Sequence, residues 1–434
     1  MNRPLCFALA FVLLFWIGIG SYPLAEPDEA RNGEIVREEV RLGNWVPPTC
    51  LGKVRYQKPP LFYWLAGLIY RNHNSIEFSV RAISALSATL LVFLVYVWGY
   101  MLAGAGDAAA LLFSSFPLVF FYARVGRMEM LLTLLCTLAI FFTWLGITRD
   151  RRMYLVISSL FCALAFITKG PVAFLFFLSA LIPWVLAKDR SRIFSVASVV
   201  LVSIIISLPV FLILEMKSPG YCYNFFWKEN VLRYTTPIFH RDKPFYYFFA
   251  VTVIGLFPWV FYITKALDSL LNLDEDRYLF VGWILLPTVF FSFSKSKLPH
   301  YILPVFPAWA IIMGLGMRSI SKRLAVILLT TYAIAVLFVM PHYLSVRSLR
   351  DMANRIKHFG ALPVYTLDDK IYGASVYTDS IAVRLKKEEL PWIDGRAWVV
   401  LRKKKLGKLM KHTRCEIEHK LSSGLYLAVM LNCD

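Results

Sequence analysis

Long apolar runs alternate with short polar segments from the N-terminus to about residue 341. Most runs are about 17–22 residues long, which is enough for a helix to cross a hydrocarbon core of roughly 30 Å. A segment in lipid must satisfy its own backbone hydrogen bonds, so we expect these runs to be helices. We place eleven spans at residues 5–21, 80–102, 107–123, 128–147, 154–168, 171–187, 193–214, 245–265, 278–293, 300–317 and 324–341.

The orientation of these spans follows from the charges of the short loops. With eleven spans, three basic loops and the N-terminal Arg3 fall on one side, which the positive-inside rule identifies as the cytoplasm. No A-x-A-like cleavage site follows the first apolar run, so we interpret it as a retained span. The loops carry Arg149, Arg151 and Arg152; Lys188, Arg190 and Arg192; and Arg318, Lys322 and Arg323.

Four segments then face the opposite side of the membrane. They are the long loop 22–79, the loop 215–244, the connection Ser292–Pro299 and the tail from His342 to Asp434. We therefore predict an all-α polytopic membrane domain over residues 1–341, with 22–79 as its first outer loop. Residues 342–434 are predicted to form a small extracytoplasmic α+β domain.

The predicted tail domain differs from the spans in its pattern. Residues 397–401 and 424–430 have the composition of strands, and a basic, helix-like stretch at 403–412 lies between them. Cys415 and Cys433 are a candidate disulfide if the tail lies in an oxidising compartment. In the first outer loop, the amphipathic stretch 31–42 predicts a helix along the membrane surface.

The amino-acid composition is typical of a membrane protein, and this affects how the high net positive charge is interpreted. Of the 434 residues, 58% are hydrophobic and 17% are charged, which leaves too little polar surface for a soluble chain of this length. The net charge of +19 would indicate nucleic acid binding in a soluble protein. Here many basic residues flank spans, so we expect membrane lipids and no nucleic acid as partners. The seven cysteines include no C-x-x-C pair, so neither a zinc site nor thioredoxin-like chemistry is indicated.

The first candidate site is the acidic stretch Glu26-Pro27-Asp28-Glu29, directly after the first span. Pro27 fixes its own backbone and favours an extended Glu26. One interpretation is an acidic helix start, with Asp28 or Glu29 as the cap. The other is a general base, or a carboxylate that orients an acceptor nucleophile.

The second candidate is Lys58, in the sequence Tyr56-Gln-Lys-Pro-Pro-Leu-Phe-Tyr-Trp64. An interfacial aromatic belt explains Tyr63 and Trp64. It does not explain a lysine held beside Pro59. A fixed ammonium at headgroup depth suits a lipid phosphate.

The other candidates lie at the predicted outer ends of spans. Glu129 follows Arg124 and Arg127, which indicates either a helix-end ion pair of little energetic weight or a site. Lys169, at a helix break, is explained by a side chain that extends to the interface. One further segment gathers phosphate-compatible donors at a helix end and indicates either a solvated loop or a phosphate site; it contains Lys295, Lys297, His300 and Tyr301. The loop 215–244 contains Lys228, Glu229, Asn230, Arg233, His240 and Arg241 among aromatic residues.

Taken together, these motifs resemble the GT-C superfamily of polyprenyl-phosphate-sugar-dependent glycosyltransferases. The likeness is to the branch with the aminoarabinose–lipid A transferases and the protein mannosyltransferases. It covers roughly residues 1–345 and says little about the sugar. The matching motifs, in order, are Pro27-Asp-Glu-Ala-Arg31, Lys58-Pro-Pro-Leu-Phe-Tyr-Trp64, Lys169-Gly-Pro171 and Lys297-Leu-Pro-His-Tyr-Ile-Leu-Pro304.

The resemblance implies that Asp28 is the main catalytic carboxylate and that Glu129, where the family usually has Asp, is a second acidic site. It implies a phosphate role for Lys58 and, by position, for Tyr301. Gln57 is a departure, because the aminoarabinose transferases have Glu there and that Glu can take part in metal binding. A divalent metal is therefore a weakened expectation with no assigned ligands, and no other cofactor is expected. The remaining candidate substrate-binding residues are Glu29, Arg31, Arg127, Lys297 and His300.

These inferences give one functional hypothesis and two rivals. The hypothesis is an inverting transferase in the cytoplasmic membrane that moves a sugar from a polyprenyl phosphate to lipid A, a protein or another envelope acceptor on the outer face. Asp28 would accept or orient the acceptor proton, and Lys58, Tyr301 and Lys297 would stabilise the leaving phosphate. The rivals are a transporter or flippase of a lipid-linked sugar, with ionisable residues near mid-bilayer, and a non-catalytic sensor or scaffold.

Overall fold

The computed structural model describes residues 3–237, 242–317, 321–346, 348–360, 362–367, 371–378, 380–413 and 415–433. Arg318, His240 and Arg241 of the motifs above lie outside this part. The chain forms two compact units, of which the first comprises Met1–Ile17, Tyr56–Phe62 and Ala82–Ala333. The second comprises Gly18–Arg55, Tyr63–Arg81 and Ile334–Asp434.

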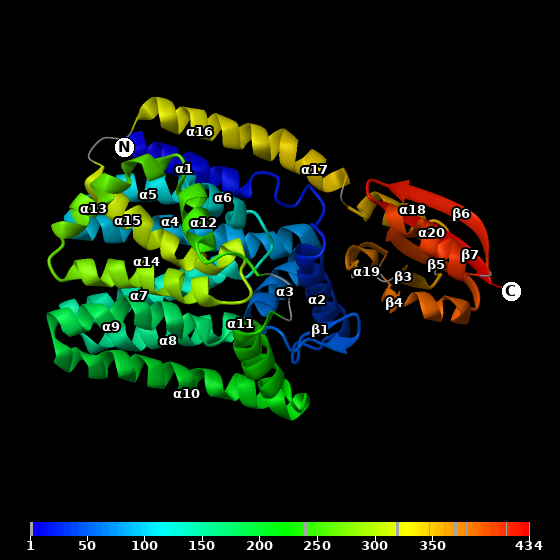
Figure 1. The fold of residues 1–434 in the computed structure, drawn as a ribbon, viewed down its shortest axis with the longest axis horizontal. Coiled ribbons are helices and arrows are strands. Elements are labelled where there is room, and N and C mark those ends of the chain that lie inside the picture. The colour runs from blue at the N-terminus through cyan, green and yellow to red at the C-terminus, as the bar shows by residue number, and fades with distance from the viewer. Residues whose placement is uncertain are drawn as a thin grey trace. The chain divides into compact units, whose positions relative to one another are not determined.

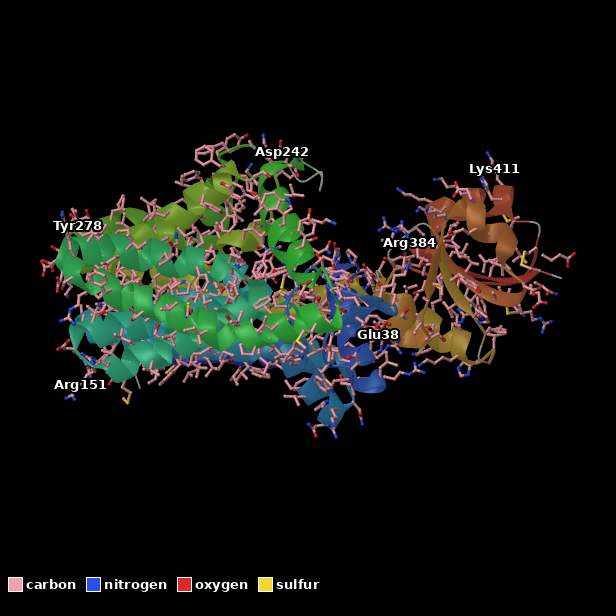
Figure 2. All side chains as sticks on the ribbon, turned by 90° about the horizontal axis from the view of Figure 1, so that it is seen from below. Glu38, Arg151, Asp242, Tyr278, Arg384 and Lys411 are labelled. Carbon is pink, nitrogen blue, oxygen red and sulfur yellow. A yellow bond between two sulfur atoms is a disulfide. The ribbon has the colours of Figure 1, made fainter. Side chains whose placement is uncertain are left out.

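The first unit is built almost entirely from apolar helices (Figure 1). Figure 2 shows Arg151 and Tyr278 at one end of these helices and Asp242 towards the other. The helices are α1 (Arg3–Trp16), α4 (Ile76–Ala103), α5 (Gly106–Ser115), α6 (Pro117–Ala123), α7 (Glu129–Thr148), α8 (Arg152–Lys169), α9 (Val172–Lys188), α10 (Ile193–Lys217), α11 (Arg233–Thr235), α12 (Tyr247–Leu256), α13 (Ile263–Leu271), α14 (Asp276–Phe293), α15 (Phe306–Gly316) and α16 (Lys322–Ile334). Candidate site residues also lie on two further helical segments, the π-helix η2 (Tyr223–Leu232) and the 3-10 helix η5 (Pro299–Val305).

The helices bear out a polytopic helical membrane architecture at the coarse level. In the described part, 7 helices are long and apolar enough to cross a membrane, or up to 9 if two bent pairs each count as one span. The pairs α5–α6 and α12–α13 bend by 69° and 94°. Pro117 and Pro258 lie at these breaks, and proline cannot continue the hydrogen bonding of a helix. Since α1 and α9 are apolar but shorter, the expected count of eleven stays a prediction.

Aromatic stacking and close helix contacts form the core of the first unit. The indole of Trp98 on α4 lies 5.1–5.8 Å, centroid to centroid, from the rings of Phe141, Trp144, Phe280 and Trp283. These contacts join α4 to α7 and α14, and the aromatic rings pack closely against the buried indole. Elsewhere, α15 approaches α5 so closely that a Cβ on Gly314 would lie 2.8 Å from a backbone nitrogen. Small residues permit such close packing between membrane helices.

The second unit contains a helical segment, which includes α2 and α3, and a mixed sheet. The sheet order is β4-β3-β5-β7-β6, with β3 parallel to β4 and β5, and β7 antiparallel to β5 and β6. The bounds are α2 (Asp28–Leu42), β1 (Thr49–Cys50), β2 (Lys53–Val54), α3 (Leu61–His73), α17 (Met340–Val346), α18 (Arg350–Lys357), β3 (Val364–Leu367), α19 (Gly373–Thr378), β4 (Val383–Leu385), β5 (Gly395–Arg402), α20 (Leu406–His412), β6 (Glu416–Ser423) and β7 (Tyr426–Cys433).

The sheet buries a continuous apolar core. Residues 397–401 of β5 are all buried, and Val399 packs in one cluster with Val429 of β7 and Leu409 of α20. A disulfide joins Cys415 to Cys433 beside this core, so the pairing considered from the sequence is confirmed. The predicted amphipathic helix of the first outer loop is present as α2.

C-terminal residues of the second unit fix the segment that precedes α2. The hydroxyl of Tyr377 accepts a hydrogen bond from the backbone N–H of Leu24 at 2.7 Å. The Glu26 carboxylate accepts hydrogen bonds from the backbone N–H groups of Tyr372, at 3.2 Å, and Gly373. Burial raises the pKa of Glu26 to about 7, although these two hydrogen bonds oppose the shift. The segment before Asp28 is therefore held in place by C-terminal residues.

The domain boundary expected between residues 341 and 342 stays a prediction.

Candidate active site

Asp28 lies in the first turn of α2, where the helix dipole favours a negative charge. Pro27 occupies the cap position, so the alternative in which Asp28 caps the helix does not hold. The Arg31 guanidinium donates to Oδ1 of Asp28 over 2.7 Å, and Asp28 retains 35% of its side-chain exposure. An ion pair with an accessible carboxylate oxygen suits a residue that must meet a substrate.

Glu29 has a different environment, although it is the next residue. Its carboxylate forms a bidentate pair with the buried Arg81, at 2.7 and 2.8 Å. The same guanidinium also donates to the backbone carbonyls of Ile19, Tyr22 and Pro23. Glu29 thus anchors the segment that precedes α2, and its expected substrate contact stays a prediction. The sequence did not reveal Arg81 as the partner, because it is a lone arginine at the edge of an apolar run.

A buried charged cluster surrounds Glu129, the first residue of α7. Its Oε1 lies 3.3 Å from both Nζ of Lys169 and Nε2 of His300, and its Oε2 lies 3.2 Å from Nε of Arg127. The hydroxyl of Tyr122 lies 3.3 Å from the other ring nitrogen of His300. With three nitrogen partners and little exposure, Glu129 is better placed to hold cations than to accept a substrate proton. We call Glu129, Arg127, Lys169 and His300 the Glu129 cluster.

Replacing Glu129 with Gln is expected to destabilise the protein. The change leaves Lys169 and Arg127 without their buried counter-charge, a loss that typically costs about 3–5 kcal/mol. The unfolding midpoint of the purified protein in detergent measures the effect.

The matched control is Glu418→Gln, which removes an exposed pair with Arg396 of 3.0 Å. Surface pairs contribute less than about 1 kcal/mol, so this midpoint should hardly move. Equal midpoints for the two variants would contradict the described role of the Glu129 cluster.

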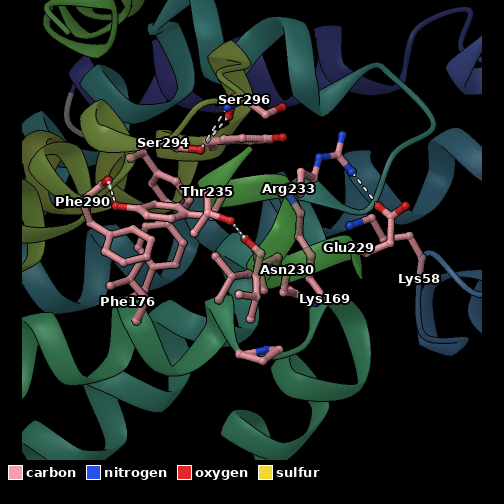
Figure 3. A pocket seen from close by; sticks show the side chains of 18 residues that line it. Lys58, Lys169, Phe176, Glu229, Asn230, Arg233, Thr235, Phe290, Ser294 and Ser296 are labelled. Carbon is pink, nitrogen blue, oxygen red and sulfur yellow. Dashed lines mark hydrogen bonds and ion pairs between the residues drawn. The ribbon is translucent and has the colours of Figure 1, made fainter. Parts of the chain in front are cut away.

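A cavity of about 340 Å³ opens beside this cluster, within the first unit (Figure 3). One part of its wall carries the cationic groups of Lys58, Lys169 and Arg233 together with Tyr301. Another part is apolar and aromatic, with Leu132, Val172, Leu175, Phe176, Phe290 and Phe291. The combination can bind a ligand that joins an anion to a hydrocarbon chain.

Lys58 enters the cavity from the Lys-Pro-Pro segment. Its backbone carbonyl accepts a hydrogen bond from the hydroxyl of Tyr221 at 2.8 Å, which fixes the segment to the connection between α10 and η2. Loss of surrounding water, followed by the nearby charges of Lys169 and Arg233, lowers the pKa of Lys58 well below its usual range. An anion in the cavity would offset both effects and favour the ammonium form.

Lys169 and Arg233 are pocket residues to which the sequence interpretation gave no phosphate role. Lys169 is the last residue of α8 and connects the Glu129 cluster to the cavity. Arg233 follows the π-helix η2 and donates to Glu229 at 2.9 Å. The sequence did predict that Lys169 and Arg233 lie on the same side of the membrane as Lys58. That prediction does not say which of the basic residues on this side contact one another.

The candidate residues of the motif from Lys297 to Pro304 separate into three environments. Tyr301 lines the cavity, and His300 belongs to the Glu129 cluster. Nζ of Lys297 instead donates to the backbone carbonyl of Lys243 at 2.8 Å. Lys297 is absent from the described cavity lining, so its phosphate role stays a prediction without geometric support.

The described residues contain no group of three His, Cys, Asp or Glu side chains placed to hold a metal ion. The structure therefore adds no ligand set to the metal expectation that Gln57 weakens.

This chain is similar to known proteins in both sequence and fold. Residues 57–214 match the family model described as dolichyl-phosphate-mannose-protein mannosyltransferase. The chain is 33% identical over 321 residues to the undecaprenyl phosphate-alpha-4-amino-4-deoxy-L-arabinose arabinosyl transferase of Edwardsiella ictaluri (strain 93-146), covering 71% of this chain and 58% of that one. The enzyme of the same name in Pectobacterium carotovorum subsp. carotovorum (strain PC1) is 30% identical, over 72% and 58% of the two chains. The chain thus spans 58% of the length of these relatives.

A solved structure extends the likeness to the whole fold. The crystal structure of ArnT from Cupriavidus metallidurans bound to undecaprenyl phosphate matches with a TM-score of 0.86, covering 98% of this chain and 97% of that one. The identity is 19%, so this match carries the fold alone. The chain is similar to these proteins in sequence and fold, and it resembles the ArnT type of GT-C polyprenyl-phosphate-sugar glycosyltransferase. The resemblance predicted from the motifs is confirmed.

Proposed function

We propose that this protein transfers a sugar from a polyprenyl-phosphate donor to lipid A or another envelope acceptor, with inversion. One observation carries the proposal: three cationic side chains and a tyrosine line the same cavity as an aromatic and aliphatic wall. The curated relatives are named as undecaprenyl-phosphate-aminoarabinose transferases, and the solved neighbour is described as bound to undecaprenyl phosphate. Both names agree with a lipid phosphate as the ligand.

Different parts of the cavity wall are proposed to bind different parts of the donor. Guanidinium and ammonium groups are the usual partners of phosphate oxygens, so Arg233, Lys58 and Lys169 are proposed to hold the phosphate. The Tyr301 hydroxyl adds a neutral donor. The apolar lining would accept the first part of the isoprenoid, while the rest lies in the bilayer.

The proposed chemistry is a direct displacement. The acceptor hydroxyl attacks the anomeric carbon, the bond to the phosphate oxygen breaks, and the electron pair leaves with the polyprenyl phosphate. Asp28 is proposed to orient the hydroxyl and take its proton. Positive groups at the phosphate stabilise the charge that develops on the leaving group. Glu129 acts by positioning Lys169, which differs from the catalytic role implied by the resemblance.

The position of the charged groups favours a transferase over the rival transporter. A transporter is expected to have ionisable residues near mid-bilayer or in broken helices there. In the described part, Glu129 is the first residue of α7 and Lys169 is the last residue of α8. Both therefore belong to helix ends.

We propose the same membrane placement as the loop charges indicate. Counting α1, α9 and each bent pair as spans gives eleven, with the N-terminus cytoplasmic and the active site and tail of residues 342–434 outside. The Cys415–Cys433 disulfide agrees with an extracytoplasmic tail, because cytosolic thiols are generally kept reduced.

Thiol labelling of intact spheroplasts tests this placement. A membrane-impermeant maleimide should label Cys415 and Cys433 only after external reduction, and the Cys415→Ser/Cys433→Ser double variant should lose that signal. A Ser191→Cys variant, in a predicted cytoplasmic loop, should gain no signal under the same conditions. Labelling of Ser191→Cys, with none at the tail, would reverse the proposed orientation.

Binding of bare undecaprenyl phosphate tests the proposed donor site directly. The purified protein should bind this lipid in detergent, and inorganic phosphate should compete only weakly, because it lacks the apolar part. Binding that depends on the phosphate alone, or no binding, would contradict the proposed function.

A further inference from the structure

Glu229 is the acidic side chain among the described residues that line the cavity. Its Oε2 accepts a hydrogen bond from Nη1 of Arg233 at 2.9 Å, and its side chain is only 13% exposed. Figure 3 shows its carboxylate close to the side chains of both Arg233 and Lys58. Among the described residues, Oε1 of Glu229 accepts no hydrogen bond. The cavity therefore presents an available carboxylate oxygen beside its cations.

This carboxylate is unfavourable for a site that binds only phosphate. It competes with the phosphate for Arg233, and it repels any anion that approaches Lys58. The arrangement is consistent if the ligand carries a hydrogen-bond donor or a positive charge near its phosphate.

Resting on the proposed function, we infer that Glu229 binds the donor sugar and selects a sugar that carries a protonated amino group. In this arrangement Arg233 and Lys58 face the phosphate, and Glu229 faces the ammonium. A zwitterionic amino-sugar phosphate then matches the cavity better than a neutral sugar phosphate, which brings no positive charge to Glu229 while its phosphate competes for Arg233. The amino sugar in the names of the curated relatives belongs to this chemical class.

The test compares wild type with Glu229→Gln, which keeps the shape and removes the charge. Three lipids serve as probes: bare undecaprenyl phosphate, undecaprenyl phosphate with 4-amino-4-deoxy-arabinose, and the same lipid with neutral arabinose. We expect wild type to prefer the amino donor in kcat/KM. Glu229→Gln should lower that preference by about 10- to 100-fold, mainly through the amino donor. Its affinity for the bare lipid should be unchanged or higher, which also shows that the variant is folded.

Two further arms isolate the charge. N-acetylation of the amino sugar should remove the preference in wild type and have no further effect in Glu229→Gln. The matched control Glu418→Gln removes a carboxylate from an Arg–Glu pair on the sheet of the second unit and should keep the wild-type preference.

The outcomes separate this inference from the proposed function. If wild type binds the bare lipid and transfers sugar, but Glu229→Gln affects both donors equally, the assignment of Glu229 is overturned and the transferase stands. If wild type neither binds the bare lipid nor transfers any sugar, the proposed function itself is overturned.

Discussion

Replacing Asp28 with Asn should lower the rate of sugar transfer by about 10²- to 10⁴-fold, the range that a positioned general base contributes. The amide keeps the size of the side chain but cannot accept the proton of the acceptor hydroxyl. Because Asp28 lies in the first turn of α2 and is partly exposed, little packing is lost. Turnover of donor by the purified protein, with its unfolding midpoint, measures both effects.

Asp351→Asn is the matched control for this change. Asp351 is also an acidic first-turn residue, at the start of α18 in the same unit. Both variants lose one helix-dipole interaction, worth roughly 0.3–1 kcal/mol, and Asp28→Asn also loses the charge of its pair with Arg31, so its unfolding midpoint should be lower than that of the control by the equivalent of about 1 kcal/mol or less. An Asp28→Asn protein that transfers sugar at the rate of Asp351→Asn would exclude Asp28 as the catalytic carboxylate.

Replacing Arg233 with Gln should weaken the binding of bare undecaprenyl phosphate by about 10- to 100-fold, since a charge-assisted hydrogen bond contributes roughly 1.5–3 kcal/mol. The guanidinium is proposed to bind the phosphate directly, and the amide supplies neither its charge nor its paired donors. Lipid binding should fall for all donors alike, because the phosphate is common to them. Equilibrium binding of the bare lipid in detergent gives the change.

Lys228→Gln is the control, because Lys228 is exposed in the π-helix η2 that directly precedes Arg233 and is absent from the described cavity lining. Both variants lose one positive charge from the same segment, so a long-range effect of net charge would weaken binding equally. An Arg233→Gln protein that binds the lipid as tightly as Lys228→Gln would remove Arg233 from the phosphate site.

The sequence predicted the parts of this account that depend on local pattern. Apolar run length predicted the helical membrane architecture, because lipid imposes a minimum length on each span. The Lys-Pro-Pro motif singled out Lys58, which lines the cavity. The two prolines restrict the backbone there, and that restriction is visible in the sequence alone.

Contacts between distant helices could not be predicted in the same way. Lys169 meets Glu129 across 40 residues, and Tyr221 meets the Lys58 carbonyl across 163. Such pairs are set by helix packing rather than by local pattern. For the same reason, the sequence grouped Lys297 with Tyr301, although their side chains take different partners. The bends at α5–α6 and α12–α13 were missed because each apolar run continues through its proline.

The stoichiometry of sugar transfer by the purified wild-type protein distinguishes a transferase from a transporter. Polyprenyl-phosphate donors with a labelled sugar are incubated with an envelope-lipid acceptor, and both products are quantified. We expect labelled acceptor and released polyprenyl phosphate in equal amounts, from at least one donor. A protein that binds or moves these lipids across vesicles, while every donor stays intact, would contradict the transferase and favour a transporter.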